Sequence, residues 1–330
     1  MVKLRYLIYC LFVCILCSCY QQISIDVPLI ILDTDFGPDY DDVGAVALLH
    51  CAADNGEAKI LSTVVSNRYP LSAPCLGIVN AYYNRPDIPI GVPQKGAVSI
   101  GSWENWLEMV YESYPYRLPS TQNVLDAVEV YRKILSEAED QSITVVTIGF
   151  FTNLYYLLQS LPDQYSKLKG KDLIQQKVCK LVCMAGEFPN GHETNIKVDS
   201  RASKCVIENW PTEIIFSGAE VGRHVKTGTR LIRDKTIDHS PVKDIYAHVM
   251  NRIERDRHGR SSYDQTAVLY AVYGCSSFFE KEKGIFVVDD KGYNSWIKSD
   301  EGKHVRLILK SDSLSLAAYI EDKMMHKPLK

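Results

Sequence analysis

The stretch that decides the fold covers residues 28–53 and reads PLIILDTDFGPDYDDVGAVALLHCAA. Residues 28–33 form a short apolar run that ends in a carboxylate, which predicts a buried strand. Residues 42–53 place apolar side chains at helical spacing, which predicts a helix. Between and at the ends of these elements, five carboxylates fall within ten residues: Asp33, Asp35, Asp39, Asp41 and Asp42. The stretch therefore predicts a strand, an acidic loop and a helix.

The chain beyond this stretch alternates between apolar strand-like runs and helical patterns. Strands alternating with helices of ten or more residues predict an α/β fold with an open, mostly parallel central sheet and helices on both faces. In such sheets ligands bind at the carboxyl ends of the strands, where the acidic loop lies. No repeat or linker divides residues 19–330, so we expect a single domain. We predict strands at 59–66, 88–91, 142–148, 178–184 and 213–217, and helices at 71–83, 122–139 and 152–160.

Composition excludes several classes of protein. The 330 residues carry 37 Lys+Arg against 40 Asp+Glu, and 46% of them are hydrophobic. These values are ordinary for a globular chain and exclude a disordered protein or a collagen-like repeat. The formal net charge of −3 excludes a polybasic nucleic-acid binder. We therefore expect no nucleic-acid partner.

The N-terminus reads as a targeting segment. Lys3 and Arg5 precede an apolar run at residues 7–16, which is too short to span a bilayer. The run ends in Leu-Cys-Ser-Cys at 16–19, which resembles a bacterial lipobox. This pattern predicts a signal peptide at 1–18 and lipid on Cys19, and hence a protein anchored to the cell envelope on its extracytoplasmic side. An ordinary signal peptide, or an uncleaved anchor with a chance cysteine, is the alternative.

The acidic loop indicates a metal site. Five neighbouring carboxylates repel one another unless a cation or helix N-termini compensate them. Hard oxygen ligands suit Ca²⁺ or Mg²⁺ better than zinc. An EF-hand is excluded, because the twelfth residue counted from Asp33 is Gly44 rather than Glu and a strand leads into the loop. Aspartates that only cap the helix are the alternative, although a cap needs one or two carboxylates.

At this point the chain resembles the inosine-uridine-preferring nucleoside hydrolases. Their signature is an apolar strand, then Asp-x-Asp-x-Gly-x-Asp-Asp, then an apolar helix. Here the loop from Asp33 to Asp42 is two residues longer. Four further segments match the family in order: TVVSN at 63–67, TIGFFTNL at 147–154, LVCMAG at 181–186 with ETN at 193–195, and YDQTAV at 263–268.

The resemblance implies a Rossmann-like nucleoside hydrolase fold and the hydrolysis of a nucleoside N-glycosidic bond to free base and ribose. It implies a Ca²⁺ cofactor, a nucleoside as the small-molecule partner, and a homodimer or homotetramer. Asp35 would also be the general base that activates water, and Tyr263 would take the place of the general acid. The metal ligands implied are Asp35, Asp42, Asp264 and the Ile148 carbonyl, and the sugar contacts are Asp41, Asn67, Met184, Asn190, Glu193 and Asn195.

Two departures from the family leave alternatives open. The longer loop allows Asp39 to replace Asp41 as the sugar or metal contact. Many members have His before the last metal Asp, as the acid that protonates the leaving base, whereas this chain has Tyr263. A phenol donates a proton less readily than an imidazolium. His258, Arg260 or aromatic stacking on the base are the other candidates, and Tyr263 is then only a wall residue.

Two rival functions remain at the level of sequence. Haloacid-dehalogenase-like phosphatases also place Asp-x-Asp after a strand, and Asp33, Ser217, Lys226 and the Asp289–Asp290 pair follow their order. That reading leaves the remaining acidic residues unexplained, and residues 289–292 are also typical of a hairpin turn. A lipid-anchored nucleoside- or sugar-binding protein without turnover is the second rival, which the absent His favours.

Overall fold

A computed structural model describes residues 27–115, 118, 124–274 and 277–329. The predicted signal peptide and Cys19 lie outside these residues, so lipidation remains a prediction. Among the described residues, none of the helices combines the length and the apolar character needed to cross a membrane.

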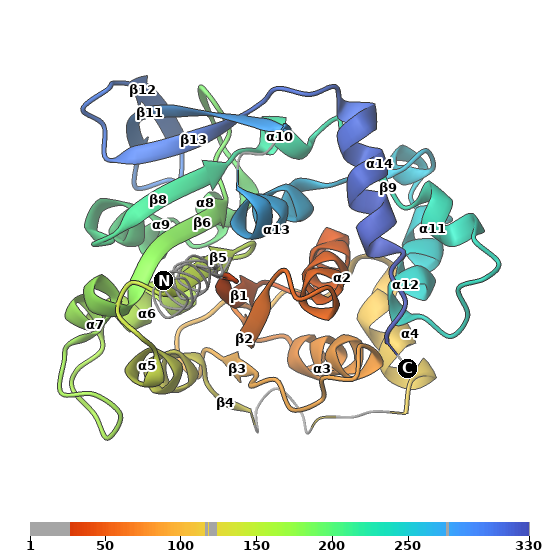
Figure 1. The fold of residues 1–330 in the computed structure, drawn as a ribbon, viewed down its shortest axis with the longest axis horizontal. Helices are drawn as coiled ribbons and strands as arrows, with labels where there is room; N and C mark the ends of the chain where they lie inside the picture. The colour runs from red at the N-terminus through yellow and green to blue at the C-terminus, as the bar shows by residue number, and fades with distance from the viewer. Residues whose placement is uncertain (1–26, 116–117, 119–123, 275–276, 330) are drawn as a thin grey trace, which may run out of the picture.

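The centre of the fold is a nine-stranded sheet in the order β2-β1-β5-β6-β8-β13-β11-β12-β7 (Figure 1). The first six strands in this order run parallel, and the last three continue the sheet in antiparallel pairing. The predicted open, mostly parallel sheet is therefore confirmed. The parallel strands are β1 (Leu29–Thr34), β2 (Lys59–Val65), β5 (Ile143–Thr147), β6 (Val178–Met184), β8 (Glu213–Ser217) and β13 (His304–Leu309). The antiparallel ones are β11 (Phe279–Val288), β12 (Asn294–Lys298) and β7 (Asn190–Gly191).

Helices cover both faces of the sheet (Figure 1). Two short strand pairs, β3 (Gly91–Val92) with β4 (Leu125–Asp126) and β9 (Lys226–Thr227) with β10 (Arg260–Ser261), lie outside the sheet. One group of helices comprises α2 (Asp41–Asp54), α3 (Ser72–Tyr82), α4 (Trp106–Ser113), α12 (Pro241–Met250), α13 (Tyr263–Tyr273) and α14 (Ser313–Met324). The other comprises α5 (Ala127–Glu137), α6 (Thr152–Gln159), α7 (Gly170–Lys177) and α9 (Ser200–Asn209). Short turns of helix are η1 (Trp103–Asn105), α8 (Thr194–Val198), α10 (Ala219–Gly222), α11 (Thr229–Arg233) and η3 (Glu254–Asp256).

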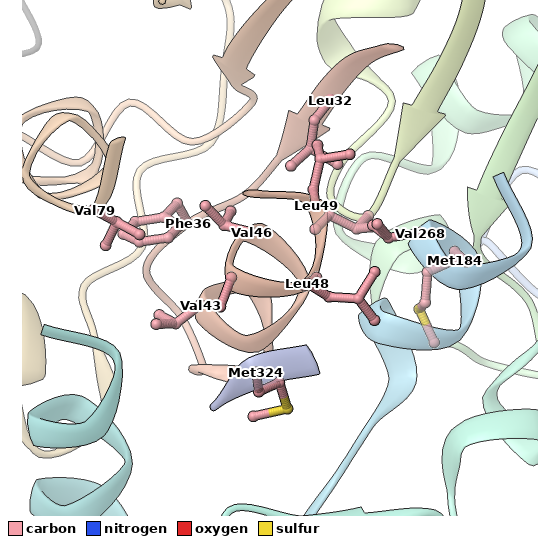
Figure 2. Close-up of a cluster of buried hydrophobic side chains, with 14 of the residues drawn as sticks. Leu32, Phe36, Val43, Val46, Leu48, Leu49, Val79, Met184, Val268 and Met324 are labelled. Atoms are coloured by element: carbon pink, nitrogen blue, oxygen red, sulfur yellow. The ribbon is translucent and has the colours of Figure 1, made fainter. Parts of the chain in front are cut away.

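Strand β1 divides the core because successive side chains of a strand point to opposite faces. Ile30 and Leu32 belong to the cluster beneath α2, whereas Ile31 belongs to the cluster beneath α5 and α6. Helix α2 is buried from Asp41 to Ala52, and Figure 2 shows its apolar side chains among those of neighbouring elements. A helix that is apolar all round belongs inside a protein, so the acidic end of α2 is fixed at the centre of the molecule.

Close packing of α2 on α13 depends on Gly44. A β-carbon at this position would lie 2.4 Å from the Gln265 amide nitrogen and 2.5 Å from the Tyr246 hydroxyl. Any larger residue would displace the Gln265 side chain of α13 and the Tyr246 side chain of α12. Because α2 begins at Asp41 and α13 begins at Tyr263, this contact sets the spacing between two groups of acidic side chains.

Two predicted elements differ from the structure. The helix predicted at 122–139 begins at Ala127, because Asp126 lies in β4 and its carboxylate accepts a hydrogen bond from the Val128 amide at 2.8 Å, which caps α5. The strand predicted at 88–91 is the two-residue β3, which pairs with β4 outside the main sheet.

Candidate active site

A cleft of about 720 Å³ opens at the carboxyl ends of the parallel strands. Asp35 and Ile148, directly after β1 and β5, and Met184, the last residue of β6, contribute to its lining. The loops after β1 and β5 touch at Gly149, where a β-carbon would lie 2.2 Å from the Asp35 backbone nitrogen. Glycine therefore lets the backbones meet closely enough to hold Asp35 and Ile148 side by side.

The floor of the cleft is acidic. Asp35, Asp39, Asp41 and Asp264 line it, and Asp42 lies beneath with no exposed surface. Carboxylate oxygens of Asp39, Asp41 and Asp264 all lie within 4.8 Å of one another, a spacing that a metal ion could bridge. This group shares Asp264 with the predicted metal set, but Asp39 and Asp41 stand where Asp35 and Asp42 were expected.

Burial and mutual repulsion make the acidic floor difficult to ionise. Burial, then the charges of Asp42, Asp39 and Asp41, raise the pKa of Asp35 well above its usual value. Burial, then the neighbouring carboxylates, likewise raise the pKa of Asp264. Burial and the Asp41 charge raise the pKa of Asp42 to about 7. A cation at this position would favour the ionised forms of all these groups.

Asp42 carries the feature that best fits a hard cation. One oxygen, Oδ1, accepts a hydrogen bond from the Thr34 hydroxyl. The other, Oδ2, is buried and has no hydrogen-bond partner among the described residues. An unpaired buried carboxylate oxygen is costly unless something positive meets it. The carboxylates of the acidic floor are oxygen donors, which suit Ca²⁺ or Mg²⁺.

Arg260 supplies a positive charge inside the acidic floor. Its guanidinium lies 2.5 Å from both Asp39 and Asp41, and its side chain is only 4% exposed. It also packs against the rings of Tyr40, Trp103 and Tyr263, with its central carbon 5.2–5.6 Å from their centroids. The sequence suggested Arg260 only as an alternative acid, and its position between two carboxylates was not foreseen.

The Asp41 and Asp39 carboxylates differ in how many ion pairs and hydrogen bonds they form. Asp41 Oδ1 pairs with Arg260, and Oδ2 accepts hydrogen bonds from the backbone amides of Tyr263 at 3.1 Å and Asp264 at 3.4 Å. Asp41 therefore ties the start of α2 to the start of α13. Asp39 has a 31% exposed side chain and pairs with Arg260 alone among the described residues. Of the two, Asp39 has the freer carboxylate.

The residues expected at the sugar on the β6 side lie together in the cleft. The Asn195 amide donates to the Met184 carbonyl at 3.0 Å and to the Ile148 carbonyl at 3.2 Å. The Glu193 carboxylate caps α8 by accepting bonds from the Asn195 and Ile196 amides, and it also accepts one from Gly186. These bonds hold Glu193 and Asn195 in place at the edge of the cleft.

Two expected sugar contacts do not line the cleft. Asn67 is fully buried, and its amide donates to the Asp35 and Ile100 carbonyls while its oxygen accepts from the Tyr69 and Ile100 amides. It fastens the loop around Ile100 instead. Asn190 lies on strand β7, where its side chain accepts a hydrogen bond from the Tyr293 hydroxyl at 2.7 Å. The pairing of β7 with β12 holds Asn190 at the edge of the sheet instead.

Of the candidates for contact with the leaving base, some line the cleft and others do not. Tyr263 lines the cleft beside Arg260, whereas the alternative acid His258 is exposed and does not line it. Trp103 lines the cleft, but Trp106 is buried and packs edge-on against Phe36 with ring centroids 5.3 Å apart. The two tryptophans of this segment therefore lie in different places, Trp103 at the cleft and Trp106 in the core.

The phosphatase alternative does not match the geometry. Asp33, its expected nucleophile, has no exposed surface, and Tyr131 and Asn153 donate hydrogen bonds to its carboxylate. Burial raises the pKa of Asp33 to about 8. The Asp289–Asp290 pair opens the hairpin loop between β11 and β12, as a turn. Asp33 therefore supports the base of the site and does not face a substrate.

Comparison with known proteins identifies the family and the fold. The family model described as inosine-uridine preferring nucleoside hydrolase matches residues 30–316. Among solved structures, a plant nucleoside hydrolase is 17% identical with a TM-score of 0.66, covering 91% of this chain and 99% of its own.

Two bacterial structures are similar to the same degree. An inosine-uridine preferring nucleoside hydrolase from Bacillus anthracis is 15% identical with a TM-score of 0.66, covering 90% of this chain and 99% of its own. A purine-preferring ribonucleoside hydrolase from Gardnerella vaginalis is 15% identical with a TM-score of 0.66, covering 90% and 98%. A search of curated proteins gave no significant match.

Because the family model matches residues 30–316, this chain belongs to the inosine-uridine preferring nucleoside hydrolases, enzymes that act on N-glycosyl bonds.

Proposed function

We propose that this chain hydrolyses the N-glycosidic bond of ribonucleosides to free base and ribose and that it requires Ca²⁺. The observation that carries the proposal is the buried acidic floor of the cleft, where Asp42 Oδ2 has no hydrogen-bond partner among the described residues. Arg260 compensates Asp39 and Asp41, whereas Asp35, Asp42 and Asp264 would be ionised near neutral pH only beside a further cation. We infer the reaction from the family, and we infer the preference for a hard ion from the carboxylate oxygens of the acidic floor.

The cation would be held by carboxylates of the acidic floor. Asp42 and Asp264 are the ligands we propose first, with Asp35 and the Ile148 carbonyl completing the set. Asp39 is the alternative ligand, because its carboxylate lies in the group with Asp41 and Asp264. Bound there, a divalent cation would lower the pKa of a water molecule in the cleft.

The chain's own residues would carry the proton transfer. Asp35 lines the cleft and would accept a proton from water while the water oxygen forms a bond to the anomeric carbon of the sugar. The carbon–nitrogen bond to the base breaks in the same step, through an oxocarbenium-like sugar. Glu193 and Asn195 would hold the ribose hydroxyls, and Met184 would pack on the sugar. Buried partners for hydroxyls discriminate against deoxysugars.

The leaving base needs a proton or a positive charge as the bond breaks. We propose Tyr263 as the donor, because it lines the cleft and its ring lies 5.6 Å from the Arg260 guanidinium carbon. The Arg260 guanidinium would favour negative charge developing on the base. If the phenol is not the donor, aromatic contact and this charge would be the remaining contributions.

The test uses purified protein, purine and pyrimidine ribonucleosides, and chromatography of free base. We expect Asp35→Asn to lose at least about 100-fold in kcat, within the range for loss of a general base. Asp290→Asn is the matched control, because its side chain is 89% exposed and pairs only with Lys204 among the described residues. Tyr263→Phe tests the acid role, with an expected loss of about tenfold or more.

Three outcomes would contradict parts of this proposal. Full activity in Asp35→Asn would remove Asp35 as the base. Full activity in Tyr263→Phe would reduce Tyr263 to a wall residue. Tight nucleoside binding with no release of base from any nucleoside would instead support the binding-protein alternative.

We also propose that the mature chain, residues 19–330, is a single domain anchored in the cell envelope by lipid on Cys19, outside the cytoplasm. Support comes only from the lipobox-like Leu-Cys-Ser-Cys at 16–19. Incorporation of a labelled fatty acid into the wild type but not into Cys19→Ala would bear this out, and equal labelling would contradict it. Assembly into a homodimer or homotetramer is proposed from the family alone, and light scattering would decide it.

A further inference from the structure

The cleft has a basic wall in addition to its acidic floor. Four cationic side chains from separate elements line it: Arg223 after α10, Lys226 on β9, Arg255 in η3 and Arg260 on β10. We call these four residues the basic wall. Antiparallel pairing of β9 with β10 brings them together, with Lys226 opposite Ser261.

Each arginine of the wall has a carboxylate partner. Arg260 is enclosed by Asp39 and Asp41. Arg223 pairs with Glu187 at 2.6 Å, and Arg255 contacts Asp256 at 3.3 Å. The Arg255 side chain is 61% exposed and its guanidinium carbon lies 4.6 Å from the centroid of the Trp103 ring, which holds it at the cleft.

Lys226 differs from the three arginines. Its ammonium donates to the Ser261 hydroxyl at 2.7 Å. Within the described part of the chain, no carboxylate forms an ion pair with it. Burial lowers the pKa of Lys226; the Asp256 and Asp41 carboxylates raise it, the Arg260 and Arg255 charges lower it further, and the balance stays below the usual value. Lys226 is thus a cation at the cleft whose charge the neighbouring residues leave under-compensated.

A ligand that fills the cleft would replace the water around this ammonium. An ammonium has three donors, and Ser261 accepts only one of them. A neutral ligand would leave donors unpaired or poorly paired, which costs free energy, whereas a charged oxygen would accept them strongly. The wall therefore favours anionic ligands and penalises neutral ones.

On the basis of the proposed function, we infer that the preferred substrate carries a negatively charged oxygen group, a phosphate or a carboxylate, bound by Lys226 and Arg255. Lys226 is the principal contact. Arg255 is the second contact, because Asp256 is its single acidic partner among the described residues and engages only part of its donors. The group sits either on the sugar, as in a nucleoside 5′-phosphate, or on an acidic base. Glu193 and Asn195 hold the sugar beside the acidic floor, and Lys226 and Arg255 bind the charged substituent.

The experiment compares base release from matched substrates. Inosine and uridine are the neutral set, their 5′-monophosphates test a phosphate on the sugar, and orotidine tests a carboxylate on the base. We expect wild-type kcat/KM to be at least about tenfold higher for one charged class than for its neutral counterpart. The class that is favoured identifies where the charge lies.

Substitutions at Lys226 test the assignment. In Lys226→Gln, the ratio of charged to neutral kcat/KM is expected to fall about 10- to 100-fold, the loss of one charge-assisted hydrogen bond. Lys226→Arg keeps the charge and should retain most of the preference. Lys298→Gln is the matched control, since this lysine is 72% exposed, pairs with Glu282 and does not line the cleft. Added salt should lower kcat/KM for the charged substrate more than for the neutral one.

Equal efficiency toward charged and neutral substrates, or an equal loss for both in Lys226→Gln, would overturn the inference while leaving nucleoside hydrolysis intact. If none of the compounds releases base, the proposed function fails and calorimetric binding of the same compounds decides the inference. Tighter binding of a charged compound that is lost in Lys226→Gln would support the basic wall as an anion site. Equal or undetectable binding would contradict it.

Discussion

Replacing Arg260 by Met removes the positive charge from the acidic floor while keeping a side chain of similar length. The guanidinium lies 2.5 Å from both Asp39 and Asp41, and the Arg260 and Asp41 side chains are 4% and 2% exposed. Loss of one partner from a buried pair costs about 3–5 kcal/mol, because the other charge stays buried. We expect that loss in the free energy of unfolding when a chelator is present, a large part of the roughly 5–15 kcal/mol of a typical domain.

Calcium should reverse part of this loss. Without Arg260 the floor carries one more uncompensated negative charge, so Arg260→Met should bind Ca²⁺ about tenfold or more tightly than the wild type. The assay is urea unfolding followed by tryptophan fluorescence, with and without Ca²⁺, together with calorimetric Ca²⁺ titration. Arg255→Met is the matched control, because its guanidinium is 61% exposed, and it should change stability by less than about 1 kcal/mol.

Two results would refute this reasoning. Equal stability of Arg260→Met and the wild type in chelator would mean that Arg260 does not compensate the buried carboxylates. Weaker Ca²⁺ binding in the variant would mean that Arg260 organises the ligands and does not oppose the ion.

Three further predictions concern pH, backbone spacing and the cation. Burial lowers the pKa of His50 from 6.5 to about 3, so the contribution of His50 to the free energy of unfolding should fall as pH drops from 6.5 toward 3; the wild type should therefore lose stability relative to His50→Gln over this range, and a constant difference between the two urea midpoints would contradict it. Gly149→Ala places a methyl group 2.2 Å from the Asp35 nitrogen, so kcat should fall at least about tenfold; wild-type turnover would show that the loops can separate. Ca²⁺ at 100 times its Kd should stabilise the wild type by about 2.7 kcal/mol, and Asp42→Asn should lose most of this; an equal gain in both would remove Asp42 from the ligand set.

Local patterns in the sequence predict the parallel half of the sheet well. Strands β6 and β8 have the predicted limits of 178–184 and 213–217. Both are apolar, β-branched runs bounded by polar residues, and such a run can be recognised from adjacent residues alone. The same holds for the strand, acidic loop and helix that begin the fold. The antiparallel end of the sheet was not predicted, because β11 opens with the alternating charges Glu280 to Lys283, which are typical of an exposed segment.

The site was predicted where residues follow one strand and missed where distant segments meet. The position of Asp35 follows from β1, and that of Met184 follows from β6. The amide of Asn67 looked available from its place after β2, but two of its hydrogen bonds join Ile100, more than thirty positions away, and no local pattern predicts that contact. The basic wall depends on the pairing of β9 with β10, two-residue strands separated by more than thirty positions. Such short strands leave no periodic signal.

The most direct test of the central claim is a calcium titration of base release. Protein is stripped with a chelator, Ca²⁺ is added back in steps, and free base from a ribonucleoside is measured beside calorimetric binding of the ion. We predict no release from stripped protein, recovery at one bound ion per chain, and loss of both binding and release in Asp264→Asn. Full activity after complete removal of the ion, or ion binding that leaves release unchanged, would contradict the account.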